Sequence, residues 1–64
     1  MQQAKTLQHR QTELQALLAT PQGRVELEEL ASSYAASGGR VRPWGTSVIT
    51  YILVHERQQG LISE

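Results

Sequence analysis

The chain contains no cysteine and no aspartate, and these absences exclude several kinds of site. Without cysteine there is neither a disulfide nor a thiolate metal site. Two histidines and no aspartate also argue against an all-protein zinc site. A nucleophile needs a base and an orienting group beside it, and few residues here could supply them. We therefore predict no enzymatic activity, no cofactor and no small-molecule substrate.

Excess charge and long apolar runs are absent as well. Six basic and six acidic side chains give a net charge of zero, which argues against a strong nonspecific hold on nucleic acid. No apolar run approaches the roughly 20 residues that span a bilayer. The N-terminus, Met-Gln-Gln-Ala-Lys, leads into polar sequence and is not typical of a secretory signal. We expect a soluble, cytoplasmic protein without membrane contact.

The chain has 64 residues, which is enough for one small domain. A domain of this size buries only about 60% of the surface that its unfolded chain exposes. Small domains often rely on a disulfide, a metal or a partner chain. With the first two excluded, we expect self-association, as a homodimer, or binding to another protein.

The first helix is predicted over residues 3–19, which are rich in Gln, Leu and Ala. Its central stripe has heptad spacing and consists of Ala4, Leu7, Gln11, Leu14 and Leu18. Such a stripe indicates either an amphipathic helix packed on its own domain or a short coiled-coil seam between two copies.

A second helix is predicted over residues 21–37. Thr20 is a suitable cap and Pro21 suits the first helical position, although the start could be as late as Glu26. The apolar positions Leu27, Leu30, Ala31 and Tyr34 follow helical spacing. The glycine pair at 38–39 ends the segment.

Residues 46–59 allow two interpretations. Their β-branched run from Val48 to Val54 has strand propensity, and a strand would pair with its copy in a dimer. The polar turn before Gly60 is typical of a helix end, so we predict a third helix, with Leu61 and Ile62 folded back on the core.

These segments predict an all-α fold of three helices, helix-turn-helix-like, with a long loop between the second and third helices. The third helix has more apolar residues than its own domain needs, and uncovered side chains at Val48, Tyr51 and Val54 would form an interface. A homodimer through the third or the first helix would cover them. The predicted core consists of Leu7, Leu14, Leu18, Leu27, Leu30, Ala31, Tyr34, Ile49, Ile52 and Leu53.

The loop carries the first candidate contact residues, Arg40, Arg42 and Trp44, which alternate along an extended segment. Two guanidiniums and an indole on one edge could bind phosphate and stack on a base. Alternatively, Trp44 fills the core between the helices, and the arginines are solvated or cap the second helix. The two histidines, His9 and His55, are interpreted as surface or helix-capping residues.

The last two thirds of the chain also carry short motifs: Glu29-Leu30-Ala31, Ser47-Val48-Ile49, Leu53 and Gly60-Leu61-Ile62. In these the chain resembles winged helix-turn-helix regulators, in which the third helix enters the DNA major groove. The resemblance implies that Ser47, Thr50, Tyr51 and Arg57 face DNA. Glu56 stands where that pattern has a core leucine.

Two functions of different classes follow from these observations. The first is a small non-enzymatic module for protein–protein interaction or oligomerisation, which the zero net charge and the surplus apolar surface favour. The second is a small DNA-binding transcriptional regulator of helix-turn-helix type, which the loop arginines and the closing Gly-Leu-Ile favour.

Overall fold

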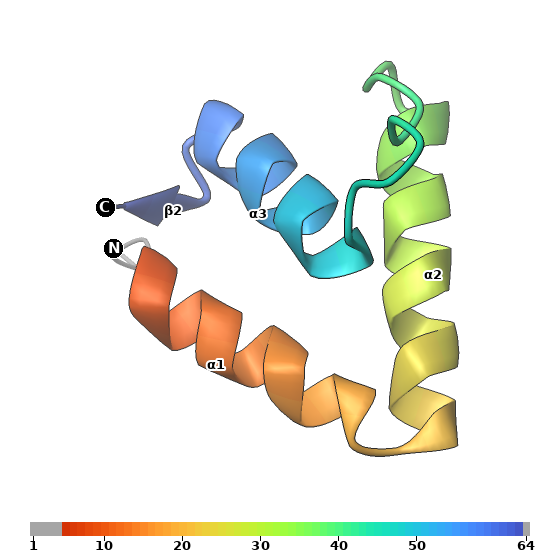
Figure 1. The fold of residues 1–64 in the computed structure, drawn as a ribbon. Coiled ribbons are helices and arrows are strands. Elements are labelled where there is room, and N and C mark those ends of the chain that lie inside the picture. Colours follow the sequence, from red (N-terminus) through yellow and green to blue (C-terminus); the bar gives the residue numbers. More distant parts are fainter. Residues whose placement is uncertain (1–4, 64) are drawn as a thin grey trace.

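The computed structural model describes residues 5–63 as three helices and two very short strands. In chain order they are β1 (Lys5–Thr6), α1 (Leu7–Leu18), α2 (Pro21–Ala36), α3 (Val48–Gln58) and β2 (Ile62–Ser63). Helices α1 and α2 form the two sides of an open angle, and α3 lies between them and contacts both (Figure 1). The predicted fold of three helices is confirmed, including the long connection between the second and the third.

All three helices begin at a hydroxyl cap. The side-chain oxygen of each cap accepts a hydrogen bond from the backbone amide three residues further on, at 3.0–3.2 Å. These caps are Thr6, Thr20 and Ser47. They satisfy amides that the first turn of a helix leaves without a partner. Pro21 occupies the first turn of α2, so this helix does not start as late as Glu26.

The predicted start of the first helix is wrong. Lys5 and Thr6 are extended and form β1, while residues 3 and 4 lie outside the described part of the chain. Strand β1 pairs in parallel with β2, so that Lys5 lies opposite Ile62. A capping threonine requires extended backbone, and for this reason the helix starts only after it.

The end of α3 follows its sequence closely. Gly60 has a φ of 76°, and its amide donates to the carbonyl of Arg57 while the amide of Leu61 donates to that of Glu56. This pair of hydrogen bonds is a Schellman motif, which glycine favours. The turn buries Ile62 as predicted, whereas Leu61 stays 55% exposed and does not fold back.

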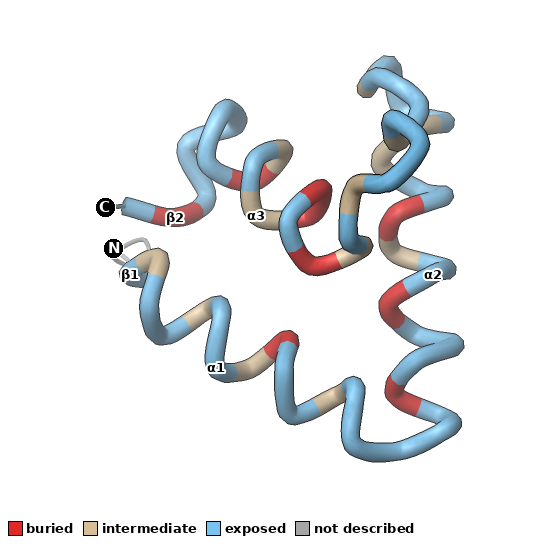
Figure 2. The backbone as a smooth tube through the Cα atoms, in the orientation of Figure 1, coloured by how far each residue is buried: buried red, intermediate tan, exposed pale blue. Residues whose placement is uncertain are grey.

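The core lies where the three helices meet (Figure 2). Within the described residues, the buried apolar side chains are Leu14, Leu27, Ala31, Ile49, Tyr51, Ile52 and Ile62. Four further members of the predicted core are only partly buried, namely Leu7, Leu30, Tyr34 and Leu53. Of the predicted stripe of α1, Leu14 and part of Leu7 thus pack on the chain's own domain.

Leu18 corrects the predicted core, because its side chain is 40% exposed. Helix α2 meets the end of α1 on the side of Leu17 instead. There the backbones come so close that a Cβ on Gly23 would lie 2.0 Å from the carbonyl oxygen of Leu17. The glycine, which the apolar pattern does not mark, therefore permits this close approach of the two helices.

Residues 48–54 lie in α3, which settles their ambiguity in favour of a helix, although the helix starts two residues later than the predicted residue 46 because Ser47 is its extended cap. Ile49, Tyr51, Ile52 and Glu56 are all buried on it, and burial on more than one side is possible because α3 lies between α1 and α2. Its β-branched residues reflect this burial rather than a strand.

Candidate interaction site

The start of the loop between α2 and α3 is fixed to both helices. The amide of Gly39 donates to the carbonyl of Tyr34 at 3.1 Å, and a Cβ on Gly39 would lie 3.2 Å from the ring of His55. The Tyr51 hydroxyl donates to the carbonyl oxygen of Arg40. The start of the loop is therefore held close to α3 by its backbone.

Trp44 stands at the corner of a tight turn in this loop. The amide of Thr46 donates to the carbonyl of Pro43 at 3.1 Å, and Gly45 has a φ of 87°, as the third position of a type II turn requires. Trp44 is fully exposed, and Val41 is 81% exposed. The interpretation of Trp44 as a core residue is therefore wrong, because Tyr51 and the leucines already fill the space between the helices.

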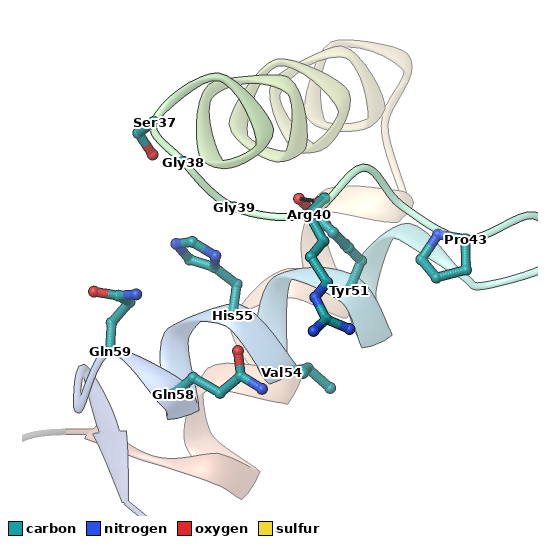
Figure 3. Close-up of a pocket in the computed structure, with 10 residues that line it drawn as sticks. All are labelled: Ser37, Gly38, Gly39, Arg40, Pro43, Tyr51, Val54, His55, Gln58 and Gln59. Atoms are coloured by element: carbon teal, nitrogen blue, oxygen red, sulfur yellow. Dashed lines mark hydrogen bonds between the residues drawn. The ribbon is translucent and has the colours of Figure 1, made fainter.

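A groove of about 580 Å³ lies between this loop and α3 (Figure 3). The end of α2 and the start of the loop form one side, and α3 forms the other. Figure 3 shows the Arg40 side chain pointing from the loop toward α3. The lining residues are Ser37, Gly38, Gly39, Arg40, Pro43, Tyr51, Val54, His55, Gln58 and Gln59.

The three loop residues that the sequence marks do not share one edge. Arg40 lines the groove beside α3, whereas Arg42 turns back to α2 and pairs with Glu28 at 3.3 Å. Trp44 contributes to neither contact and faces outward. Alternating residues face a common side only where the backbone is extended, and in this loop the turn at Gly45 interrupts the extended backbone.

On α3, the residues predicted to face DNA divide into two groups. Ser47, Thr50 and Arg57 are exposed, but the Ser47 hydroxyl already bonds to the amide and side chain of Thr50 as the helix cap. Tyr51 is buried, with 8% exposure, so it is not available on that face. Its hydroxyl instead fixes the loop.

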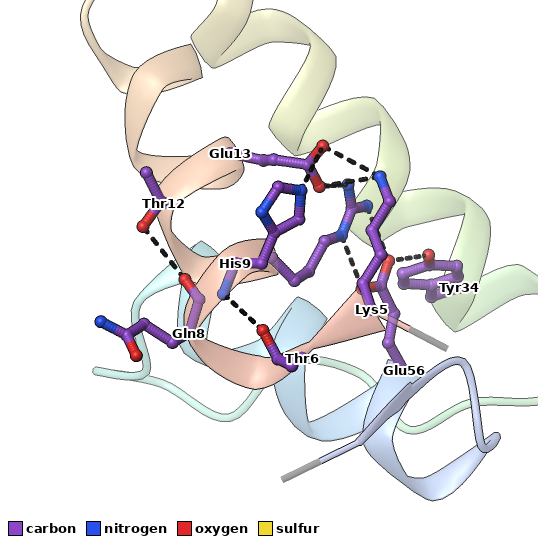
Figure 4. Close-up of polar contacts among 9 residues, drawn as sticks. Lys5, Thr6, Gln8, His9, Thr12, Glu13, Tyr34 and Glu56 are labelled. Atoms are coloured by element: carbon purple, nitrogen blue, oxygen red, sulfur yellow. Dashed lines mark hydrogen bonds and ion pairs between the residues drawn. The ribbon is translucent and has the colours of Figure 1, made fainter. Parts of the chain in front are cut away.

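A partly buried ionic network that the sequence patterns did not reveal joins α1, α2 and α3 (Figure 4). Arg10 donates from Nε and Nη2 to the two carboxylate oxygens of Glu56, each at 2.8 Å. The Tyr34 hydroxyl donates to the same carboxylate at 2.5 Å. The Glu56 side chain is only 4% exposed. The spacing of Glu56 in the sequence indicates its burial, because it lies seven residues after the core residue Ile49 and so falls on the buried face of the helix.

This network shifts the pKa values of its members. Burial raises the pKa of Glu56, but the hydrogen bonds from Arg10 and Tyr34 outweigh burial, and the pKa lies below its ordinary value. Burial and the hydrogen bond to Glu56 raise the pKa of Tyr34 to about 12. The hydrogen bond with Glu56 likewise raises the pKa of Arg10. The pair is therefore ionised throughout the neutral range.

His55 connects the network to the groove. Its ring stacks on that of Tyr34, with centroids 4.1 Å apart and planes inclined by 16°. One face of the imidazole is therefore covered, and the residue still lines the groove. His9 lies on the outside of α1, where its Nε2 is 3.7 Å from Glu13.

Within residues 5–63, no group of three or more His, Cys, Asp or Glu side chains is arranged to hold a metal ion. None of the helices in this part of the chain is long and apolar enough to cross a membrane. Comparison with protein-family models, with curated proteins and with solved structures gave no match for this chain. The site must therefore be interpreted from its own chemistry.

Proposed function

We propose that this protein is a non-enzymatic module for protein–protein interaction or oligomerisation, which binds through the loop at 38–45 and the adjoining groove. The observation that carries the proposal is the full exposure of Trp44, the single tryptophan of the chain. Tryptophan is among the residues that contribute most to binding energy at protein interfaces.

The way the loop is held supports this proposal. Hydrogen bonds to Tyr34 and Tyr51 fix its backbone, and a closed turn presents Trp44. A contact element that is ordered before binding loses less conformational entropy when it meets a partner. Val41 and Val54, which are 81% and 49% exposed, supply further apolar surface in the same region.

The chemistry of the groove also supports a binding role rather than catalysis. Its hydroxyl groups already make structural hydrogen bonds, because Ser37 donates to the Tyr34 carbonyl and Tyr51 donates to the Arg40 carbonyl. Neither hydroxyl is set against a base, which is the arrangement that activates a nucleophile.

The partner is a second copy of the chain or another protein. With Tyr51 buried, the outer face of α3 offers less apolar surface than the sequence indicated, and Val54 is its main exposed apolar residue. An interface at this place therefore needs the loop as well as the helix.

Light scattering over a range of concentrations tests the proposal, with Trp44→Ser compared with Val25→Ser. Val25 is 55% exposed on α2 and serves as the matched control. We expect a salt-independent dimer that Trp44→Ser dissociates and Val25→Ser leaves intact. For a monomeric protein, quantitative mass spectrometry of proteins retained from the source cells should show partners lost with Trp44→Ser alone. Identical behaviour of the two variants in both assays would refute the proposal.

A second candidate is DNA binding of helix-turn-helix type, and the distribution of charge favours it. Residues 37–63 contain three arginines, and their single carboxylate, that of Glu56, is buried. Thr50 and Arg57 are exposed on α3. A DNA-binding protein should bind a fluorescent duplex at low salt and lose affinity steeply as salt is added or on Arg40→Ala. Absence of binding at low salt would eliminate this candidate.

A further inference from the structure

The groove between the loop and α3 has an unbalanced charge. Arg40 is the single permanently charged residue among those that line it, and the lining contains no carboxylate. The remaining polar side chains are the imidazole of His55, the amides of Gln58 and Gln59, and the hydroxyls of Ser37 and Tyr51, which already donate within the chain. A ligand group that complements this lining is therefore anionic.

The guanidinium of Arg40 also lacks a partner within the described residues. It makes no ion pair or hydrogen bond there, and its backbone carbonyl alone takes part in one. By contrast, Lys5, Arg10 and Arg42 each pair with a glutamate of the chain. Arg40 thus keeps its planar set of donors available for an external carboxylate, which it can bind through two parallel hydrogen bonds.

The rest of the lining fits a peptide segment. Pro43 and Val54 supply exposed apolar contacts, and Gly38, where a Cβ would meet nothing within 4 Å, leaves room for a second main chain. The volume of about 580 Å³ lies within the range of sites that enclose a small ligand.

We propose that the groove binds a short acidic segment of a partner protein, in which an aspartate or glutamate pairs with Arg40 and a neighbouring apolar side chain packs on Pro43 and Val54. This inference rests on the proposed function and names its class of partner. A nucleic-acid backbone fits less well, because affinity for it comes from several phosphate contacts together, and this groove offers one guanidinium beside apolar surface.

Selection from a random peptide display library on the immobilised protein tests the inference. We expect the selected peptides to contain an acidic residue next to an apolar one. Arg40→Glu should weaken a fluorescent copy of the best peptide roughly tenfold or more, since a charged hydrogen bond contributes about 1.5–3 kcal/mol and 1.4 kcal/mol is tenfold. Selection on Arg40→Glu should instead favour lysine or arginine.

Arg24→Glu is the matched control, because Arg24 is an exposed arginine on α2 outside the groove. It should change the peptide affinity by less than about twofold. Nuclear magnetic resonance should place the peptide by shifting the signals of Val54 and His55. Similar losses with both arginine variants would show a general charge effect and overturn the inference.

The remaining outcomes separate the inference from the proposed function. Selected peptides without an acidic preference overturn the inference while protein binding stands. A library that yields no binder also overturns it, and the light-scattering and retention experiments then decide the proposed function on their own. Binding of duplex DNA that depends on Arg40, with no peptide selected, would overturn the inference in favour of the nucleic-acid alternative.

Discussion

The buried pair of Arg10 and Glu56 gives the most direct test of the structure. Replacing Arg10 by methionine keeps an unbranched side chain that can fill the same space, but it removes both donors to the Glu56 carboxylate. Glu56, which is 4% exposed in the structure, would then keep Tyr34 as its remaining hydrogen-bond partner among the described side chains. We expect this variant to be strongly destabilised, because an uncompensated charge remains in the core.

The structure sets the size of this effect. Breaking a buried pair by removing one partner typically costs about 3–5 kcal/mol. Arg10 is 21% exposed, so water can reach part of the site, and we expect a value near the lower end, about 3 kcal/mol. The total stability of a domain of this size is roughly 3–10 kcal/mol. Arg10→Met should therefore remove a large part of the stability of the fold.

A double-mutant cycle measures the coupling. Glu56→Leu places at this position the residue that the helix-turn-helix pattern has there, but it leaves Arg10 and the Tyr34 hydroxyl without their partner. The double variant, Arg10→Met with Glu56→Leu, leaves no buried charge and should recover much of the loss, since apolar replacement of a buried pair is often neutral. We expect a coupling energy above about 1.5 kcal/mol.

Urea unfolding followed by far-ultraviolet circular dichroism gives the free energies of unfolding at neutral pH. The cost of Arg10→Met should also shrink in acid, because the stranded carboxyl of Glu56 becomes protonated. A cost below about 0.5 kcal/mol, or a double variant whose loss equals the sum of the two single losses, would refute the network as the structure shows it.

Three further predictions concern the turns and the titration of the network. At a site with room for a methyl group, replacing glycine by alanine usually stabilises a protein by about 0.4–1 kcal/mol. Gly23→Ala should instead destabilise the fold by more than that amount, because the new Cβ would overlap the Leu17 carbonyl. Equal or higher stability in urea would contradict this contact. Gly60→Ala should cost about 1 kcal/mol because its φ is 76°, and an unchanged melting temperature would argue against that conformation. The pKa of Glu56 is lowered by folding, so its contribution to stability is present above pH 4.5, the ordinary value, and is lost as the pH falls through the folded pKa. The pKa of Tyr34 is raised by folding, so its contribution to stability is present below pH 10 and is lost as the pH rises toward about 12. Unfolding curves measured across both ranges should show both losses, and Glu56→Leu should flatten the acid limb.

The sequence by itself determined the three helices and, except for the start of α1, placed their ends within two residues. Hydroxyl residues before apolar runs, proline at a first turn and glycine after a last turn act through local backbone geometry, which depends on near neighbours in the chain. Thr20, Ser47 and Gly60 therefore do in the structure what their positions predict. Apolar spacing likewise identified Leu14, Leu27 and Ile52, whose side chains are completely buried.

Only the tertiary structure decided what lies between the helices. Leu18 continues the apolar spacing of α1 yet is 40% exposed, because the core covers α1 on the side of Leu14 and Leu17. Tyr51 and Trp44 are both large aromatics, and the path of the loop buries the first and exposes the second. Such outcomes depend on contacts between residues far apart in the chain, which composition and local spacing do not encode.

The same reason applies to the candidate site. An arginine in a polar loop could bind phosphate, pair with a neighbouring carboxylate or stay solvated. The local sequence does not distinguish these three roles. The fold pairs Arg42 with Glu28 on α2 and leaves Arg40 beside the groove. It also brings Arg10 to Glu56 across 46 positions of sequence and makes a charged residue part of the core. A charge becomes a buried partner or a binding group according to what the fold places beside it.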